Sequence, residues 1–258
     1  MLTGMSRPTA LVTGPTAGIG LAFAHELARR GNDLVLVSRN RDRLEEVAAE
    51  LRAAHGVDVE VIAADLADRT DLARVEARVA ATERPVDLLV NNAGFGLKHG
   101  FLDNVVETEQ RMLDVLVTAV LRLSHAAMKQ MVARGDGGII NVSSVAGYLP
   151  RGTYSAAKAY VTQLSQWADL TYRDRGVRTM ALLPGFTKTE FHARMDVGRD
   201  SAPSWMWLDA DWLVRDALSD FAKGRTVSVP SVRYKALSAV AKYTPAGLQA
   251  RFQALGRK

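Results

Sequence analysis

The chain has 258 residues, of which 48% are hydrophobic and 24% charged, and it contains no cysteine. A chain of this length buries about 70–75% of its unfolded surface around one core, which excludes a small disulfide-stapled protein. The lack of cysteine excludes thiolate catalysis and cysteine-bound zinc or iron–sulfur clusters. The net charge of +5 is unevenly distributed, because Phe221 to Lys258 carries eight basic and no acidic side chains.

Two features of the sequence bear on the location of the protein. No window of 18 residues is both apolar and free of charge, and Met1 to Thr9 lacks the apolar stretch of a secretion signal. We therefore expect a cytoplasmic protein that does not span a membrane. Its basic C-terminus allows peripheral contact with one.

Short runs rich in Val, Ile and Leu recur along the chain, separated by longer segments of helical periodicity. The strands are predicted at Thr9–Thr13, Asp33–Ser38, Val57–Ala63, Val86–Val90, Gly138–Ser143, Val177–Leu183 and Thr226–Val229. The helices between them are predicted at Ile19–Arg30, Arg41–His55, Arg69–Glu83, Asn104–Ala133 and Thr153–Arg175. This alternation predicts an α/β fold, a doubly wound Rossmann sheet of seven parallel strands with helices on both faces.

We predict a single domain over residues 1–258, because no linker or repeat divides the chain. Residues 1–186 form its cofactor-binding and catalytic core, 187–225 a substrate flap, and 226–258 the last strand and basic C-terminal helices. The stretch from Thr187 to Asp209 places aromatic residues and Met among Gly, Pro and Ser. It is either a mobile flap or a helix–loop with core anchors, and its candidate substrate contacts are Phe191, His192, Trp205 and Trp207.

The turn after the first predicted strand is rich in glycine and reads Thr13-Gly14-Pro15-Thr16-Ala17-Gly18-Ile19-Gly20. Glycine lets the backbone bend sharply and lets a pyrophosphate approach the free N–H groups at the start of the helix. Glycines also occur in tight turns for structural reasons alone, but the position of these between strand and helix favours a dinucleotide site. The candidate contacts are Gly14, Thr16, Gly18, Ile19 and Gly20.

The end of the second predicted strand bears on the choice of nicotinamide cofactor. It reads Leu36-Val37-Ser38-Arg39-Asn40 and has no acidic residue to bind a ribose 2′-hydroxyl, whereas an Arg pairs with a 2′-phosphate. We therefore predict NADP(H) rather than NAD, with Arg39 on the adenine or the phosphate and Ser38 or Asn40 assisting. Alternatively, Arg39 belongs with Arg41 and Arg43 to a solvated helix entrance.

Polar or small residues follow two further strands. Because ligands of open α/β sheets bind outside the carboxyl ends of the strands, these residues are candidate cofactor contacts, although each group also suits a turn. They are Asp65 and Leu66 after the third strand, and Asn92, Ala93 and Gly94 after the fourth.

Tyr154 and Lys158 lie four residues apart on one face of a predicted helix. A phenol with a pKa of about 10 is a weak acid–base group at neutral pH, and a nearby ammonium lowers that pKa. Lys158 is also placed to hold a ribose. The upstream strand end offers Ser144, whose hydroxyl can polarise a substrate carbonyl.

Five motifs occur in the order TGxxxGIG, NNAG, NVSSxAG, YxxxK and Leu183-Pro184-Gly185. Together they resemble the short-chain dehydrogenase/reductase family over about Thr9 to Thr189. The resemblance implies a seven-stranded Rossmann sheet, a nicotinamide cofactor and reversible hydride transfer between a carbonyl and an alcohol.

The resemblance also implies roles for single residues. Ser144 would orient the carbonyl oxygen, Tyr154 would donate or accept the proton, and Lys158 would lower the pKa of Tyr154 and bind ribose. The remaining cofactor contacts it implies are Asp65 at the adenine, Asn92 along the cofactor, Pro184 and Gly185 in the turn, and Thr187 and Thr189 at the carboxamide and phosphates.

Two departures limit the transfer from the family. Leu116 stands where the family usually has an Asn that supports a water-mediated proton relay, so we expect slower proton delivery. Ser144 and Tyr154 are ten positions apart, about three fewer than usual, and the shortening falls in a predicted loop.

The C-terminal stretch from Tyr234 contains an apolar and basic helix, a Pro break, and then Leu248, Phe252 and Leu255 at helical spacing. Such a helix can lie on an anionic membrane or dock an acidic partner. Alternatively, its apolar face packs on the substrate lobe or on a neighbouring subunit.

These patterns predict an NADP(H)-dependent oxidoreductase, a carbonyl reductase or alcohol dehydrogenase that uses Tyr154 as acid–base on an apolar or lipid-like substrate. We expect a homodimer or homotetramer, no metal and no nucleic-acid partner. The alternative is a nicotinamide-binding regulatory or scaffold protein with little turnover, motivated by Leu116 and the short loop before Tyr154.

Overall fold

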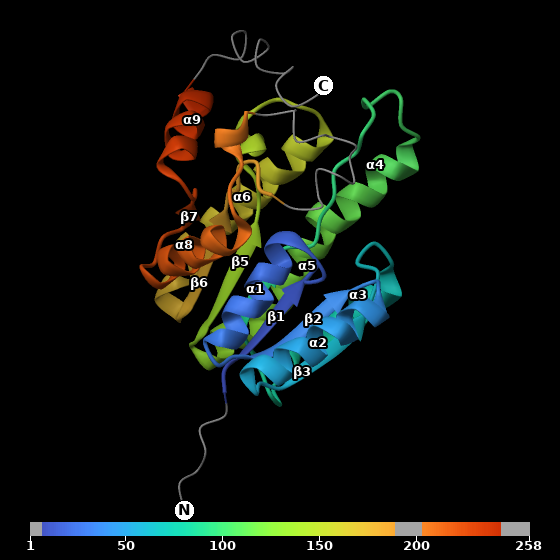
Figure 1. The fold of residues 1–258 in the computed structure, drawn as a ribbon, viewed down its shortest axis with the longest axis vertical. Coiled ribbons are helices and arrows are strands. Elements are labelled where there is room, and N and C mark those ends of the chain that lie inside the picture. Colours follow the sequence, from blue (N-terminus) through green and yellow to red (C-terminus); the bar gives the residue numbers. More distant parts are fainter. Residues whose placement is uncertain (1–6, 189–202, 244–258) are drawn as a thin grey trace, which may run out of the picture.

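The computed structural model describes residues 7–188 and 203–243. At its centre lies a seven-stranded parallel sheet in the order β3-β2-β1-β4-β5-β6-β7 (Figure 1). The strands are β1 Thr9–Thr13, β2 Asp33–Ser38, β3 Val59–Ala63, β4 Val86–Asn91, β5 Gly137–Val142, β6 Val177–Leu182 and β7 Val227–Ser228. The predicted doubly wound sheet is confirmed, and its order reverses between β1 and β4, where such sheets bind ligands.

Helices cover both faces of the sheet. They are α1 Gly18–Arg29, α2 Arg41–His55, α3 Arg69–Ala80, α4 Val106–Leu113, α5 Ala119–Arg134, α6 Thr153–Tyr172, α8 Ala210–Ala222 and α9 Val232–Tyr243. Short helical turns complete the described residues: η1 Asp114–Thr118, η2 Val145–Tyr148, η3 Arg173–Arg175 and η5 Ser204–Met206. Within these ranges no helix has the length and apolar character needed to cross a bilayer.

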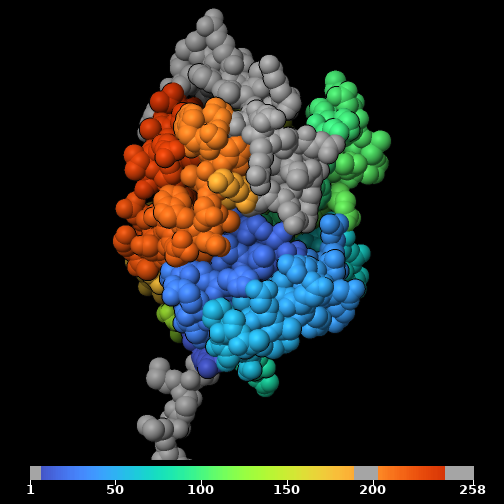
Figure 2. All heavy atoms as spheres, in the orientation of Figure 1, coloured from blue at the N-terminus to red at the C-terminus, as the bar shows by residue number. Residues whose placement is uncertain are grey.

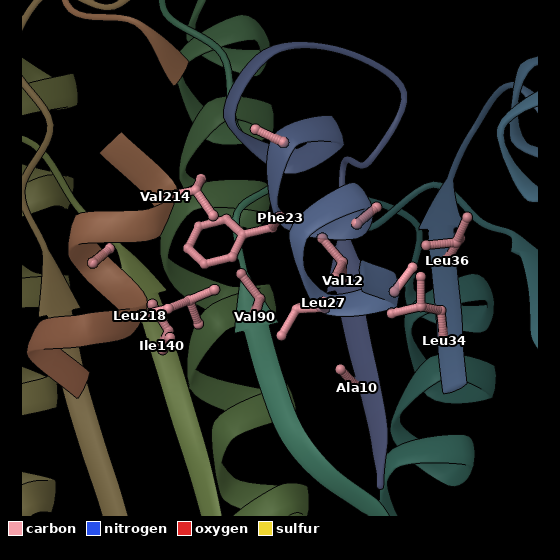
Figure 3. Close-up of a cluster of buried hydrophobic side chains, with 14 of the residues drawn as sticks. Ala10, Val12, Phe23, Leu27, Leu34, Leu36, Val90, Ile140, Val214 and Leu218 are labelled. Carbon is pink, nitrogen blue, oxygen red and sulfur yellow. The ribbon is translucent and has the colours of Figure 1, made fainter. Parts of the chain in front are cut away.

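The two-residue period of the strands sorts their side chains onto the two faces. In β1, Ala10 and Val12 join the cluster beneath α1, α2 and α8, whereas Leu11 joins the cluster beneath α3 and α5. Figure 3 shows Phe23 of α1 pointing between Val214 of α8 and the sheet. Burying a Phe side chain contributes about 1.5–3 kcal/mol, so this contact helps hold α1, and the turn before it, against the sheet.

The structure corrects two predicted elements. The helix expected over Asn104–Ala133 is divided by the π-helical turn at Asp114–Thr118, whose wider hydrogen-bonded ring no periodicity indicates. Helix α8 was not predicted, because the Trp- and Met-rich stretch before it hides where it begins. Its buried residues nevertheless follow helical spacing, at Leu213, Val214, Ala217 and Leu218.

Candidate active site

The glycine turn forms one wall of the site. Gly14 and Gly18 have φ angles of +67° and +57°, the left-handed region that favours glycine. A Cβ on Gly20 would lie 2.1 Å from the Gly14 carbonyl oxygen, so only glycine lets α1 approach the turn this closely. No side chain caps the first turn of α1. The half-exposed Thr16 and Ile19 lie beside these N–H groups, which therefore suit a phosphate.

Asn92 ties the ends of β1 and β4 together. Its Nδ2 donates to the carbonyl oxygens of Thr13 at 2.9 Å and Gly14 at 3.1 Å. In return, the Thr13 hydroxyl oxygen accepts from the N–H groups of Asn92 and Ala93, both at 2.9 Å. The Asn92 amide thus fixes the conformation of the glycine turn. The sequence predicted only a contact of Asn92 with the cofactor and not this structural role.

The end of β2 separates Arg39 from its basic neighbours. Asn40 caps α2 by accepting from the Arg43 N–H at 3.0 Å, so it serves the helix. Arg41 and Arg43 form ion pairs with glutamates of their own helix. Arg39 is exposed, and among the described residues no carboxylate lies within ion-pair distance of it. The alternative of a solvated helix start therefore explains Arg41 and Arg43. It does not explain Arg39, whose guanidinium can still bind a phosphate.

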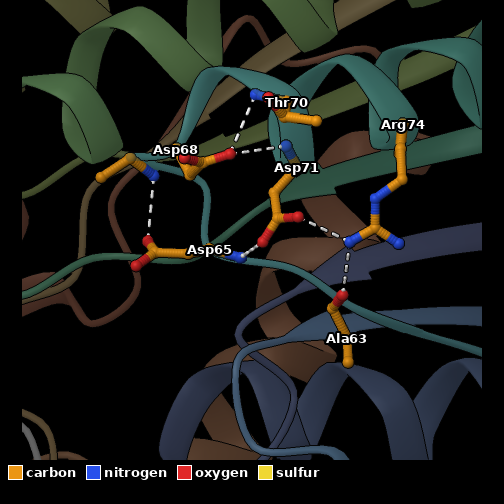
Figure 4. Close-up of polar contacts among 7 residues, drawn as sticks. Ala63, Asp65, Asp68, Thr70, Asp71 and Arg74 are labelled. Atoms are coloured by element: carbon orange, nitrogen blue, oxygen red, sulfur yellow. Dashed lines mark hydrogen bonds and ion pairs between the residues drawn. The ribbon is translucent and has the colours of Figure 1, made fainter.

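Asp65 follows β3 and is held on several sides (Figure 4). Its Oδ1 accepts from the Ala67 N–H at 3.0 Å, and its Oδ2 forms an ion pair with Arg111 of α4. Burial opposes its ionisation, but the Ala67 N–H, Arg111 and the charge of Arg39 outweigh burial and lower the pKa of Asp65. Asp65 is therefore a fixed anion near Arg39. The neighbouring Leu66 side chain is buried in the core, so only its backbone can reach a ligand.

Ser144, Tyr154 and Lys158 come together at the end of β5 and the start of α6. The Ser144 side chain hydrogen-bonds the Tyr154 phenol. Lys158 is buried, its Nζ donates to the Val142 carbonyl oxygen at 2.8 Å, and it lies 5.7 Å from the centroid of the Tyr154 ring. The shortened loop before Tyr154 therefore does not keep the three groups apart.

The structure also distinguishes the two adjacent serines. Ser143 is buried, and its hydroxyl donates to the Lys158 carbonyl oxygen at 2.7 Å and contacts the Thr162 hydroxyl at 2.8 Å. Ser144 is partly exposed and faces Tyr154. Ser143 therefore holds α6 to the end of β5, while Ser144 accepts from the Ala146 N–H at 3.1 Å and keeps its hydroxyl beside Tyr154.

The direction of the Tyr154 pKa differs from the prediction. Burial raises the pKa of Tyr154 to about 12, and the hydrogen bond from Ser144 acts against it. Burial also lowers the pKa of Lys158 to about 8. The Lys158 Nζ is turned to the Val142 carbonyl and lies 5.7 Å from the centroid of the Tyr154 ring, so burial dominates the phenol pKa in this structure. The phenol is therefore protonated at neutral pH and suited to donate a proton.

Apolar side chains surround this polar group. Leu116 lies in the π turn η1, is buried, and belongs to a cluster with Met112 and Ala157 that the Tyr154 ring contacts. A Cβ on Gly94 would lie 2.8 Å from Leu116 Cδ2 and 3.8 Å from Lys158 Nζ. Leu116 thus closes one side of the site beside Lys158 without offering it a polar side chain.

The end of β6 forms the opposite side of the site. The Pro184 carbonyl oxygen accepts from the Val145 N–H at 3.1 Å, next to Ser144. Thr187 is buried, and its hydroxyl donates to the Gly185 carbonyl oxygen at 3.1 Å. The Trp207 ring lies 5.6 Å from that of Phe186, while Trp205 is exposed. The predicted contacts Thr189, Phe191 and His192 lie outside the described residues.

Two residues that the sequence did not indicate support the site. Glu109 of α4 is buried and accepts hydrogen bonds from Asn104 at 2.8 Å and from Thr153, which precedes Tyr154. It thereby holds the start of α6, where Gly152 offers no capping side chain. Tyr234 of α9 is buried against Gly185. No local sequence pattern marks either residue, because each contacts a segment that is distant in sequence.

Comparisons with known proteins agree with this geometry. The family model of the short chain dehydrogenases matches residues 8–199. The human very-long-chain 3-oxoacyl-CoA reductase is 34% identical over 191 residues, which cover 70% of this chain and 60% of that protein. The relative from Anas platyrhynchos with the same name is also 34% identical, over 189 residues and 60% of its length. The match therefore spans only about 60% of these curated relatives.

Solved structures match over nearly the whole chain. A short-chain dehydrogenase from Sphingobium yanoikuyae in complex with NADPH has a TM-score of 0.84 and 37% identity, covering 94% of this chain and 95% of that one. The bulky-bulky ketone specific alcohol dehydrogenase from Comamonas testosteroni has a TM-score of 0.80 and 32% identity, covering 95% of both chains. The sheet order, the glycine turn and these matches show that the chain belongs to the short-chain dehydrogenase/reductase family of oxidoreductases.

Proposed function

We propose that the protein reduces carbonyl compounds to alcohols with NADPH, with Tyr154 as the proton donor. The observation that carries this proposal is the hydrogen bond between Ser144 and Tyr154 beside the buried Lys158, at the edge of the sheet where the glycine turn lies. A protonated phenol and a second hydroxyl next to it can together hold one carbonyl oxygen.

Each group has a distinct task in this reaction. The nicotinamide supplies the hydride when it is bound. Ser144 donates a hydrogen bond to the carbonyl oxygen and orients it. Tyr154 gives its proton to the same oxygen as negative charge develops there, and the Lys158 ammonium stabilises the resulting phenolate. The apolar cluster around Leu116 excludes water, which strengthens both interactions.

The residues at the other end of the site fit NADPH. The left-handed glycines and the uncapped start of α1 suit a pyrophosphate, and Arg39 is a free cation where β2 ends. Asp65 and Asn92 are placed at the adjoining strand ends. The structural relative from Sphingobium yanoikuyae is in complex with NADPH, which supports the same cofactor here.

We further propose an apolar, lipid-like substrate. The Tyr154 ring contacts a cluster of buried apolar residues, and partly buried Phe95 and Leu97 lie against the same cluster. The relatives are named for very-long-chain 3-oxoacyl-CoA and for bulky ketones, which are carbonyl compounds with a long acyl chain or bulky groups. A 3-oxo acyl compound of long chain should therefore be reduced with a lower KM than a short one.

Peripheral contact with a membrane is proposed through α9. This helix buries Tyr234 and Ser238 and turns Val232 and Val240 outward, with exposed fractions of 80% and 60%. Its buried Tyr234 packs on the turn after β6, as the alternative of packing on the substrate lobe expects, so the membrane contact is proposed only for the outward residues. Leu248, Phe252 and Leu255 lie outside the described residues.

The predicted homodimer or homotetramer remains a proposal. It is supported by large apolar side chains exposed on α5 and α6, namely Leu121, Trp167 and Leu170. Sedimentation equilibrium distinguishes a monomer from either assembly.

The experiment that tests the activity is NADPH oxidation with ethyl acetoacetate and its longer 3-oxo acyl homologues. Tyr154→Phe should lower kcat by about 10²–10⁴-fold, because the proton donor is lost, while NADPH still binds. Tyr172→Phe is the matched control, since Tyr172 lies at the far end of α6. Turnover of Tyr154→Phe equal to that of the control would refute the proposed role, and no turnover with any homologue would refute the proposed substrate class.

A further inference from the structure

Tyr234, near the start of α9, is 3% exposed and packs on the turn that follows β6. A Cβ on Gly185 would lie 2.0–2.3 Å from carbons of the Tyr234 ring, so the turn accepts the ring only because residue 185 is glycine. The ring therefore contacts a residue that the sequence placed at the cofactor.

The Tyr234 hydroxyl joins two segments that are distant in the chain. It accepts from the Phe186 N–H at 2.9 Å and donates to the Met206 carbonyl oxygen at 2.9 Å. Both bonds are partly buried, and a buried backbone group left without a partner costs about 1–3 kcal/mol. One phenol thus connects the chain before residue 189 with the chain after residue 202.

Neighbouring contacts reinforce this connection. The Leu208 N–H donates to the Phe186 carbonyl oxygen at 2.8 Å, and the Lys188 N–H donates to the Leu208 carbonyl oxygen at 2.9 Å. Arg233, next to Tyr234, donates to the Trp205 carbonyl oxygen at 2.6 Å. In Figure 2, α9 and the segment that contains η5 lie side by side at the surface.

The same turn leads directly to the catalytic residues. Pro184, beside Gly185, accepts from the Val145 N–H at 3.1 Å, and Val145 follows Ser144. Tyr234 is therefore linked, through the Phe186 N–H and the Pro184 carbonyl, to the residue that follows Ser144. This makes it a positioning residue rather than a catalytic one.

We propose that Tyr234 fixes the 184–187 turn and the 205–207 segment relative to Ser144, so that α9 is part of the wall against which the carbonyl substrate binds. The inference rests on the proposed carbonyl reduction. It assigns to the C-terminal helix a role in substrate binding that is separate from its outward, membrane-facing side.

The test is Tyr234→Phe, which keeps the ring on Gly185 and removes both hydrogen bonds, with Tyr172→Phe as the matched control. With NADPH saturating and ethyl acetoacetate and its longer 3-oxo acyl homologues as probes, KM should rise about tenfold and kcat should change less, equivalent to about 1.4 kcal/mol of lost substrate binding. In parallel, the Phe186 amide should exchange with deuterium faster in Tyr234→Phe than in the control.

Each result decides between distinct ideas. An unchanged KM together with a lower unfolding temperature would show that Tyr234 is structural only, and would overturn the positioning role. An unchanged Phe186 exchange rate would overturn the idea that the Tyr234 hydroxyl fixes the 184–187 turn. This measurement needs no substrate. Failure of the proposed function is seen separately, as absence of turnover in the unmodified protein with every probe.

Discussion

Arg39 is an exposed cation at the end of β2. The two residues that follow it already have hydrogen-bond or ion-pair partners in α2. Asn40 caps α2, and Arg41 pairs with Glu45, so the local structure explains both. The Arg39 guanidinium is close enough to Asp65 to lower the pKa of that carboxyl, yet it forms no ion pair with it. A 2′-phosphate at this strand end would give the Arg39 guanidinium an ion-pair partner.

We predict that Arg39→Asp weakens NADPH binding about 10–100-fold and NADH binding much less, because a charged hydrogen bond is worth about 1.5–3 kcal/mol. Fluorescence titration with both cofactors measures this, and Arg41→Asp is the charge-matched control. Equal losses for NADPH and NADH in Arg39→Asp would contradict the assigned role.

The raised pKa of Tyr154 and the lowered pKa of Lys158 have a consequence for the pH dependence of reduction. Tyr154, with a pKa of about 12, keeps its proton throughout the neutral range. Lys158 loses its charge as pH rises through about 8, and with it the stabilisation of the phenolate. We expect kcat to be level below about pH 8 and to fall above it.

Lys158→Arg provides the check on this pH profile, because a guanidinium stays charged to a pH of about 12.5. Its kcat should be lower overall, since Arg does not fit the Lys158 site, but the fall near pH 8 should disappear. A wild-type rate that increases through pH 8 would show that the phenol must ionise first.

At the scale of elements, α1 is held by a partly buried carboxylate. Glu26 has a side chain that is 8% exposed and forms ion pairs with Arg29 and Arg30. The hydrogen bond from Arg29 is the largest cause that lowers its pKa, burial opposes it, and Arg30 adds to it, so the pKa falls from 4.5 to about 2. The charged form is therefore favoured in the folded protein.

The stability supplied by Glu26 is present above pH 4.5 and is lost as pH falls toward about 2, because the folded pKa lies below the unfolded one. Glu26→Gln should lower the urea midpoint at pH 7, and its difference from wild type should shrink as pH is lowered. Glu50→Gln, on the exposed side of α2, is the control. A deficit that does not change between pH 7 and pH 2.5 would contradict this linkage.

Helix α4 shows why an element can matter beyond its own packing. Its Arg111 holds Asp65 beside the cofactor end, its Glu109 holds Thr153 at the catalytic end, and its Met112 lies in the apolar cluster. One helix thereby fixes both ends of the candidate site relative to each other.

At the scale of the whole molecule, the proposed membrane contact concerns the outward face of α9 and the basic character of the C-terminal sequence. On the helix, Val232, Ala236 and Val240 form an exposed stripe, with Arg233 on one side and Lys235 on the other. Long basic side chains beside an apolar stripe can reach lipid headgroups while the stripe enters the interface.

We predict that the intact protein binds anionic phospholipid vesicles in low salt and that Lys235→Glu with Val240→Ser weakens this binding. The loss should be about tenfold, since one basic residue near an anionic surface contributes about 1 kcal/mol and the Val adds apolar area. Lys129→Glu with Val106→Ser, which makes the same changes on α5 and α4, is the control for co-sedimentation. Equal binding by both double variants would remove α9 as the contact surface.

The strands, the glycine turn and the Tyr154–Lys158 pair were predictable because their signals are local. A buried parallel strand needs a continuous apolar run, a left-handed turn needs glycine, and a four-residue spacing puts two side chains on one helical face. The sheet and the identity of the candidate catalytic residues follow from such patterns, whatever the rest of the chain does.

Other features depend on segments that only folding brings together. Helix α8 owes its place to α1, which it covers across the core, and Tyr234 owes its role to a turn nearly 50 residues earlier. The hydrogen bond of Ser143 to the Lys158 carbonyl and the raised pKa of Tyr154 depend on which groups are buried. Burial and long-range contact are properties of the packed molecule, so spacing along the chain carries no trace of them, and the tertiary structure alone decided these points.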